Sequence, residues 1–170
     1  MTEQPPSKAP SESMTEMVQV VLPNDANPLG YLLGGTAMHL IDIAGAIAGH
    51  RHTRSLLVTA AVDGLQFLNP IKIGDLIILK ARVTAVWKTS LEVEVEVFSE
   101  ETLTGRRRMT SLAYLTFVAV DGDSRHRPIP GLILETDDDR RRAAEAEVRR
   151  AERLRARSRL QTRLGPIATQ

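Results

Sequence analysis

The chain has 170 residues, 42% hydrophobic and 25% charged, which suffices for one domain with a core and not for two. It contains no cysteine, so disulfides, thiolate metal sites and a cysteine nucleophile are excluded. The net charge of +1 hides an asymmetry. Residues 140–170 hold ten Arg and three Glu, a charge of +7, whereas residues 1–139 hold twelve Lys and Arg and eighteen Asp and Glu, a charge of −6. The basic character therefore belongs to the C-terminal part.

The first 13 residues are rich in Pro, Ser and Glu without apolar periodicity, which predicts a disordered leader. They lack the apolar run of a signal peptide, and no segment reaches the roughly 18 apolar residues of a membrane span. We therefore expect a cytoplasmic protein with no membrane span. Residues 15–22 carry β-formers in partial alternation and predict a first strand, which leads into a loop rich in Pro, Asn and Gly.

Residues 27–52 place one carboxylate in the middle of an otherwise apolar helix, expected from about residue 35 to residue 50 and buried on most sides. That carboxylate is Asp42, and an ionised side chain there is costly unless it is paired, hydrogen-bonded or used. Gly34 and Gly35 precede the helix and let another group approach the free N–H groups of its first turn. The segment therefore combines a helix N-terminus that can bind an anion with a candidate general base about two turns later.

Four strand-like segments follow, at residues 58–67, 76–87, 91–98 and 107–120. The third alternates strictly and places Glu92, Glu94 and Glu96 on one face, which predicts a sheet with one solvated face. The last is nearly continuously apolar, as is typical of a central strand. Small residues in the helix would let a curved sheet approach it, and exposed sheet edges would favour pairing of two copies. The pattern predicts an α+β fold, with one antiparallel sheet around one helix.

The chain divides into a leader of residues 1–13, a domain of residues 14–131 and a C-terminal extension of residues 132–170. From residue 137, three Asp precede a run of Arg, Ala and Glu with few larger apolar residues, which predicts a solvated, partly frayed charged helix. A nucleic-acid or membrane-surface arm is the alternative for so many arginines. The interspersed Glu and the alanines favour a solvated or oligomer-contacting helix, with no nucleic-acid partner.

A set of landmarks occurs in a fixed order: Asn27 before Gly30, the adjacent Gly34 and Gly35, the acid in the helix, FLNP at 67–70, GD at 74–75, TS at 89–90 and LTGRRR at 103–108. Over roughly residues 15–130 the chain resembles the acyl-CoA thioesterases of the cytosolic acyl-CoA hydrolase type. The resemblance implies the hotdog fold, a curved antiparallel sheet of about five strands wrapped around one long central helix. It also implies hydrolysis of fatty acyl-CoA to fatty acid and CoA by a homodimer, often assembled as a trimer of dimers.

The resemblance also implies roles for individual residues. Asn27 of one protomer and Asp42 of the other match the catalytic positions, and Asp42 would either deprotonate a water or attack the thioester to give an anhydride. Backbone N–H groups around Gly34 and Gly35 could hold the carbonyl oxygen. The expected CoA contacts are Lys88, Thr89, Ser90, Arg106, Arg107 and Arg108, and the residues expected beside the acyl chain are Leu40, Ile43 and Phe67. No metal or cofactor is expected, because coenzyme A is part of the substrate.

Each assignment has a structural alternative. Asp42 could be a paired structural acid, Asn27 the centre of an Asx turn, the glycines a packing feature and the arginines a solvated cluster. His39, one turn before Asp42, is a candidate hydrogen-bond partner, although a structural histidine is the simpler interpretation. A non-catalytic acyl-CoA sensor and a hotdog hydratase stay open as other functions, but no His precedes the helix in the hydratase pattern. The absence of a G-x-S-x-G elbow removes the serine-hydrolase route.

Overall fold

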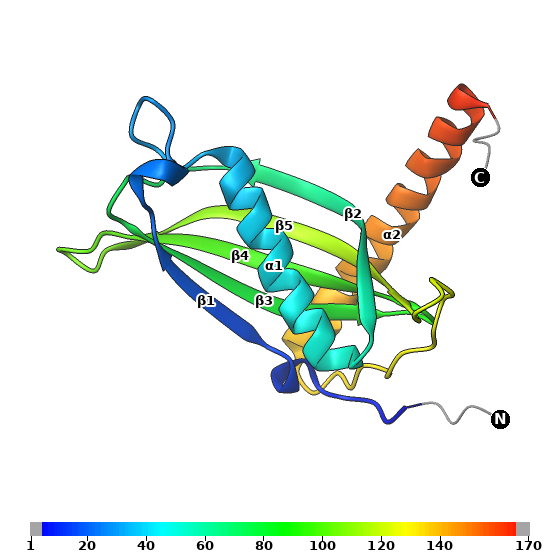
Figure 1. The fold of residues 1–170 in the computed structure, drawn as a ribbon. Coiled ribbons are helices and arrows are strands. Elements are labelled where there is room, and N and C mark those ends of the chain that lie inside the picture. Colours follow the sequence, from blue (N-terminus) through cyan, green and yellow to red (C-terminus); the bar gives the residue numbers. More distant parts are fainter. Residues whose placement is uncertain (1–4, 166–170) are drawn as a thin grey trace.

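The computed structural model describes residues 5–165 as a five-stranded antiparallel sheet with a long helix on each face (Figure 1). The elements in chain order are η1 (Pro10–Glu12), β1 (Thr15–Val20), η2 (Pro23–Asp25), α1 (Gly34–Thr53), β2 (Leu56–Phe67), β3 (Leu76–Val86), β4 (Ser90–Glu100), β5 (Arg107–Val120) and α2 (Asp137–Leu164). The strand order is β1-β3-β4-β5-β2, so β1 and β2 are the edges and β5 is internal, as its apolar run predicted. The predicted architecture, a curved sheet around one central helix, is confirmed.

The core lies between the inner face of the sheet and one face of α1. Leu40, Ile41 and Ala44 belong to that face and are at most 6% exposed. Two glycines let the helix come close, because a Cβ on Gly49 would lie 2.6 Å from Leu57 Cδ1 and one on Gly45 would lie 3.2 Å from the Phe117 ring. The small residues of the helix therefore have the role predicted for them.

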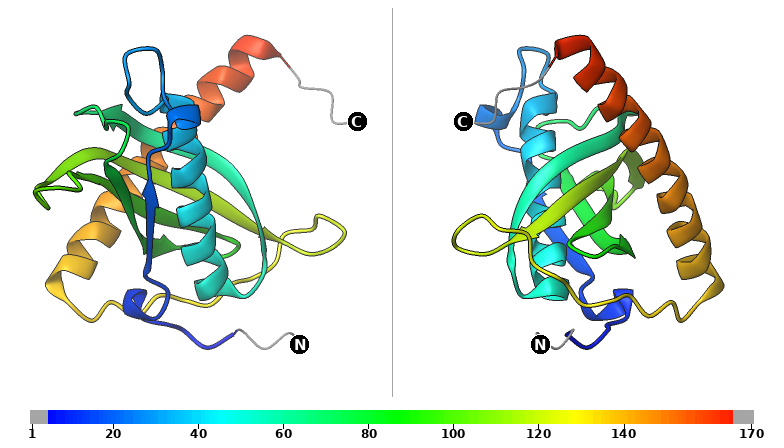
Figure 2. Two further views of the ribbon diagram at one scale, coloured as in Figure 1. Left: turned by 60° about the vertical axis from the view of Figure 1, so that its left-hand side comes forward. Right: turned by 90° about the vertical axis from the view of Figure 1, so that its right-hand side faces the viewer.

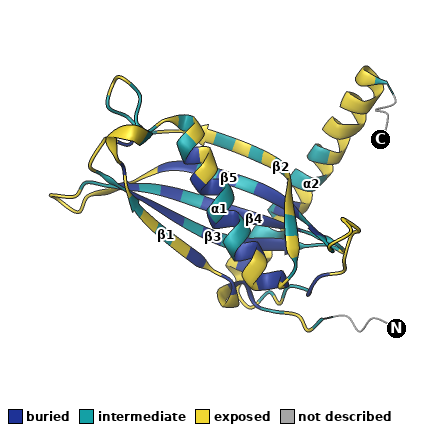
Figure 3. Ribbon diagram, viewed as in Figure 1, coloured by how far each residue is buried: buried dark blue, intermediate teal, exposed yellow. Residues whose placement is uncertain are grey.

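The opposite face of α1 is open, contrary to the prediction of a helix buried on most sides (Figure 3). Met38 is 48% exposed and His39 is also exposed, whereas Asp42 is half-buried. Several apolar residues on the edge strand β2 are similarly exposed, namely Leu56, Val58, Val62 and Phe67. A single chain therefore leaves an apolar surface uncovered along α1 and β2.

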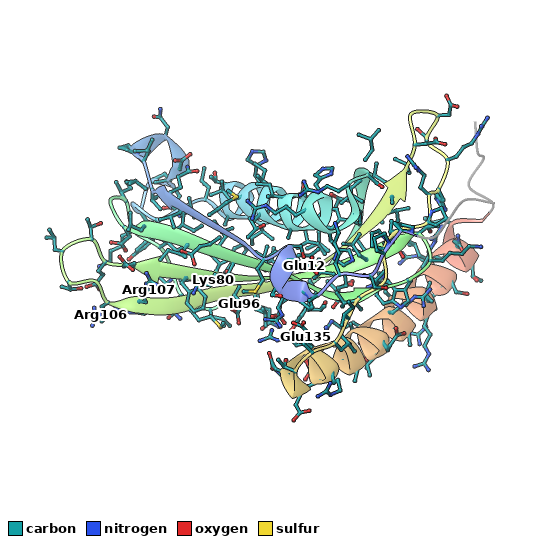
Figure 4. All side chains as sticks on the ribbon, turned by 90° about the horizontal axis from the view of Figure 1, so that it is seen from below. Glu12, Lys80, Glu96, Arg106, Arg107 and Glu135 are labelled. Carbon is teal, nitrogen blue, oxygen red and sulfur yellow. The ribbon has the colours of Figure 1, made fainter. Side chains whose placement is uncertain are left out.

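The outer face of the sheet is covered by α2, so the prediction of a solvated acidic face was wrong. Glu92 and Glu94 are 0% and 5% exposed, and they pair with Arg149 and Arg142 of α2. Figures 2 and 4 show α2 on the face opposite α1. Only Glu96, which lies beyond the helix, keeps part of the expected exposure. Alternation correctly predicted which side chains share a face, but not that arginines would cover that face.

The helix α2 has two different halves. Thr136 caps it through a 3.0 Å bond from the Asp139 N–H, in a capping box that explains the acidic start. Asp139 and Ala146 are buried against the sheet, whereas residues 154–164 are exposed and extend past β2 (Figure 2). The predicted solvated helix is thus correct only for the second half. In residues 5–165 no helix is both long and apolar enough to cross a membrane.

The N-terminal segment packs on the domain from at least residue 8, although a disordered leader was expected up to residue 13. Lys8 Nζ donates hydrogen bonds to the carbonyl oxygens of Arg51 and His52 at 3.1 and 2.8 Å. Ala9 and Ser13 are buried. Residues 1–4 of the expected leader lie outside the described residues. Hydrogen bonds from the Lys8 side chain to the end of α1, which composition does not reveal, help to fix this segment.

Candidate active site

Asp42 of α1 and Thr59 of β2 form the first part of the site. Thr59 Oγ1 donates a hydrogen bond of 2.7 Å to Asp42 Oδ1. The hydroxyl donor fixes the orientation of the carboxylate, while the second oxygen stays available to a reactant. The sequence indicated that Asp42 needs a partner but not that Thr59 supplies it. The one signal was a lone hydroxyl in the apolar run LLVTAAV, and the pairing depends on tertiary structure.

His39 does not supply that partner. It is exposed, and within residues 5–165 no hydrogen bond joins it to Asp42. The described part of the chain also contains no group of three or more His, Asp or Glu placed to hold a metal ion. The expectation of a metal-free site stays a prediction.

A cavity of about 340 Å³ lies at the far end of β2. It is formed by the loop after η2, the start of α1 and the segment after β2, and its lining includes Asn27, Tyr31, Gly34, Ala37, Phe67, Asn69, Thr110 and Ser111. The structure therefore brings together three predicted site residues: Asn27, Gly34 and Phe67. Asp42 does not line this cavity, because it lies eight residues along α1 from Gly34, about 12 Å at 1.5 Å per residue.

Asn27 forms a turn and presents an amide donor as well. Its Oδ1 accepts hydrogen bonds from the N–H groups of Leu29 at 3.0 Å and Tyr31 at 3.1 Å, an Asx-type arrangement. Its Nδ2 has no hydrogen-bond partner within residues 5–165. The turn thus holds the carbonyl end of the amide and leaves the two N–H donors for a group in the cavity.

The start of α1 has unpaired donors. The N-cap is Leu33, whose side chain makes no capping hydrogen bond, so the first-turn N–H groups at Gly34 and Gly35 lack that acceptor. A Cβ on Gly34 would lie 3.5 Å from the Phe67 ring, whereas a Cβ on Gly35 would meet nothing within 4 Å. Packing within one chain therefore does not require glycine at position 35. These N–H groups are suited to a developing negative charge.

The two loops expected to contact CoA lie at opposite ends of the sheet. Ser90 pairs with Val118 and Glu100 with Arg107 in the β4–β5 ladder, a separation of ten residues or about 33 Å. Figure 4 shows Arg106 and Arg107 at the end of the sheet far from α2. One chain therefore does not bring Lys88, Thr89 and Ser90 together with the arginines of the other loop.

The arginine loop lies at the same end as the cavity, since Thr110 and Ser111 follow it in β5. Arg106 and Arg108 pair with Glu101, and Arg107 pairs with Glu100. The hydrogen bond from Arg106 lowers the pKa of the Glu101 carboxyl. These arginines are exposed, and Glu100 and Glu101 partly neutralise their charge. They lie at the end of the sheet that contains the cavity, but they do not form a closed phosphate site.

Of the three residues expected beside the acyl chain, one lines the cavity. Phe67 is 52% exposed and forms part of the cavity wall. Leu40 is 6% exposed and belongs to the core, and Ile43 is half-buried on the helix without lining the cavity.

Comparison with known proteins agrees with this fold. The model of the thioesterase superfamily matches residues 29–105. The acyl-CoA thioester hydrolase YkhA of Bacillus subtilis, itself uncharacterized, is 36% identical over 137 residues, which are 81% of this chain and 80% of the relative. The human cytosolic acyl coenzyme A thioester hydrolase is 31% identical over 82% of this chain, and the chain spans only 37% of its length.

Solved structures give the same result. An apo-hexameric acyl-CoA thioesterase superposes with a TM-score of 0.85 at 34% identity, over 89% of this chain and 97% of the other. The Staphylococcus aureus acyl-CoA hydrolase, solved with butyryl-CoA, CoA and CoA disulfide, superposes with a TM-score of 0.83 at 32% identity, over 94% of this chain and 100% of the other. That enzyme has also been solved with one Asp, one Thr or one Asn replaced by Ala.

The curved sheet around α1 is the hotdog fold, and the relatives identify its class as the thioesterases. The chain belongs to the acyl-CoA thioester hydrolases of the thioesterase superfamily.

Proposed function

We propose that the protein hydrolyses acyl-CoA to a free acid and CoA at a site shared by two copies of the chain. Asp42 and Thr59 of one protomer would act with the partner's Asn27 and the partner's Gly34. One observation carries the proposal: the Asp42–Thr59 bond lies on an exposed edge strand, about 12 Å along α1 from the cavity that contains the Asn27 of the same chain.

The geometry of β2 supports a shared site. A twofold axis through the middle of β2 (Leu56–Phe67) would pair the strand with its own copy, antiparallel, and extend the sheet. Thr59 would then lie opposite the partner's Gly64, three residues or about 10 Å from the partner's Phe67. Within one chain, Thr59 and Phe67 pair with Phe117 and Ser111 of β5, which are six residues or about 20 Å apart. Pairing would therefore bring Thr59, which holds Asp42, closer to the partner's Phe67 than to the Phe67 of its own chain.

The chemistry follows from these positions. The free oxygen of Asp42 takes a proton from a water, and the resulting hydroxide attacks the thioester carbon. The N–H donors of the partner's Asn27 and the partner's Gly34 hold the charge that develops on the carbonyl oxygen. The C–S bond then breaks, and the proton on Asp42 passes to the departing CoA thiolate. Thr59 fixes the carboxylate throughout.

The relatives support the choice of residues. The Staphylococcus aureus enzyme has been studied with an Asp, a Thr and an Asn replaced individually by Ala. Asp42, Thr59 and Asn27 are residues of the same three types in the proposed site. Three similar proteins are described as hexameric, which supports a trimer of dimers for this chain. The human relative is described as cytosolic, and we propose the cytoplasm for this chain too.

Release of thiol from a series of acyl-CoA substrates tests the proposal. The purified chain should release CoA well above the uncatalysed rate for at least one chain length, and the active species should elute as a dimer or larger. Binding of acyl-CoA without thiol release at any chain length would refute hydrolysis and leave a binding module. Full activity in a monomer would refute the shared site.

A further inference from the structure

A second groove, of about 410 Å³, lies on the outer face of the sheet, between the second half of α2 and strands β2 and β5. Its lining combines small and apolar side chains with Thr116 of β5 and three arginines of α2, namely Arg150, Arg153 and Arg157. Thr59 points to α1, and the next residue, Ala60, lines this groove on the other face. The groove is therefore distinct from the cavity at Asn27, although both are built on β2.

The floor of the groove contains an unsatisfied hydroxyl. Thr116 pairs with Glu92 on one side and Ala61 on the other, so the three side chains share the outer face. Glu92 is occupied by Arg149 and by Thr84, which donates to it at 2.7 Å. Thr116 is 6% exposed, yet its Oγ1 has no hydrogen-bond partner within residues 5–165. A buried hydroxyl without a partner is costly, and this one lines the groove.

The wall formed by α2 is cationic. Arg150, Arg153 and Arg157 are spaced three and four residues apart and share one helix face. Arg153 pairs with Asp63 at 2.5 Å, and the Arg150 guanidinium lies 4.6 Å from the centre of the Trp87 ring. Arg157 has no acidic partner within the described residues. Residues 150–164 contain six Arg and one Glu, an excess charge of +5 beside the groove.

These features select a class of ligand. One arginine can bind two phosphate oxygens at once, and its guanidinium can stack on a flat ring. The hydroxyl of Thr116 adds a hydrogen bond, and the alanine and leucine side chains offer an apolar surface. The volume falls within the range of about 300 to 1,000 Å³ that is typical of small-molecule sites. We propose that this groove binds the phosphate groups of a nucleotide. The nucleotide is either the phosphorylated adenosine end of the acyl-CoA itself, which rests on the proposed function, or a separate nucleotide.

Binding of adenosine 3′,5′-bisphosphate, measured by calorimetry on the full chain, tests the groove. The wild type should bind it, and Arg157→Ala should weaken binding by about tenfold or more, as expected for loss of a charge-assisted contact. Thr116→Val should weaken it by less. Arg155→Ala is the matched control, because Arg155 is exposed on the same helix but does not line the groove. No binding by the wild type, or equal losses in Arg157→Ala and Arg155→Ala, would overturn the proposal.

Two substrates separate the two sources. If the groove holds the nucleotide of the substrate, Arg157→Ala raises KM for acyl-CoA and leaves KM for the matching acyl-pantetheine unchanged. If the ligand is a separate nucleotide, Arg157→Ala leaves KM unchanged for both substrates while bisphosphate binding still falls. Failure of the wild type to hydrolyse either substrate would refute the proposed function, whereas the calorimetric result would still decide the groove.

Discussion

Thr59 Oγ1 lies 2.7 Å from Asp42 Oδ1, and this hydrogen bond joins the edge strand β2 to the middle of α1. It is the only side-chain hydrogen bond between α1 and β2 within the described residues. The Asp42 carboxylate is thus held by a strand whose other edge pairs with no strand within residues 5–165. Any change that moves β2 should therefore also change the position of Asp42.

Replacement of Asp42 by Asn removes the base and keeps the size of the side chain. We expect kcat to fall by about 100- to 10,000-fold, the usual contribution of general acid–base catalysis, with little change in CoA affinity. Thiol release and calorimetry with CoA would measure the two effects. His39→Ala serves as the control and should keep wild-type activity. A fully active Asp42→Asn protein would contradict the assigned role.

Replacement of Thr59 separates the hydroxyl from the shape of the side chain. Thr59→Val should lower kcat by about tenfold, because one hydrogen bond to the carboxylate is lost, while KM changes little. Thr59→Ser keeps the donor and should recover most of the activity. Equal losses in the two variants would indicate that packing, rather than the hydrogen bond, matters at this position.

A charge on the β2 edge should prevent pairing of two chains. Val62 is 45% exposed in the single chain and lies near the middle of β2. Val62→Lys should place two ammonium groups close to the twofold axis and shift the protein to smaller species with lost activity. Val18→Lys on the other edge strand, β1, is the matched control, since Val18 is 53% exposed. Light scattering combined with thiol release would show whether assembly and activity fall together.

Removal of one partner of a buried ion pair should destabilise the fold. Glu92 is 0% exposed and pairs with Arg149, so Arg149→Met leaves a buried carboxylate without its cation and should cost about 3–5 kcal/mol of unfolding free energy. The double variant Arg149→Met with Glu92→Leu should recover much of this loss. Arg141→Ala, which breaks exposed pairs only, should cost at most about 1 kcal/mol. Denaturant titrations would measure all three.

His52 should make stability depend on pH. Burial lowers its pKa, the Pro130 carbonyl partly opposes this effect, and nearby Lys8 adds to it whereas Glu12 opposes it. Because the folded state binds the proton less tightly than the unfolded chain, the unfolding free energy should fall as the pH drops below about 6.5. His52→Gln should reduce the difference in unfolding free energy between pH 7.5 and pH 5.5. Identical pH dependence in the two proteins would contradict this expectation.

The elements could be predicted because their signals are local. The alternation in residues 91–98 identified β4, and the small residues of α1 predicted its close contact with the sheet. The three Asp residues from residue 137 identified the start of α2. The site was harder to predict, because the bond between Thr59 and Asp42 joins residues 17 apart through a strand pairing that no local pattern encodes. Gly34 was identified from its position at the helix start and Asn27 from the resemblance, whereas their shared cavity became visible only in the fold.

The covering of Glu92 and Glu94 could not be predicted from periodicity. Helix α2 has almost no apolar stripe, and it attaches through arginines that reach acids on the sheet. A helix without an apolar face is ordinarily interpreted as solvated. The information lay in the charges of two distant segments, Glu on β4 and Arg on α2, whose complementarity becomes visible only when the two are in contact.

The helix α2 therefore neutralises much of the negative charge of the rest of the domain. Residues 1–139 carry a charge of −6 and residues 140–170 carry +7, and some of these charges meet in ion pairs across the outer face of the sheet. A chain shortened before residue 140 would change from a weakly basic to a strongly acidic protein. It would also leave Glu92 and Glu94 without their cations, so that the two parts of the chain depend on each other for neutrality.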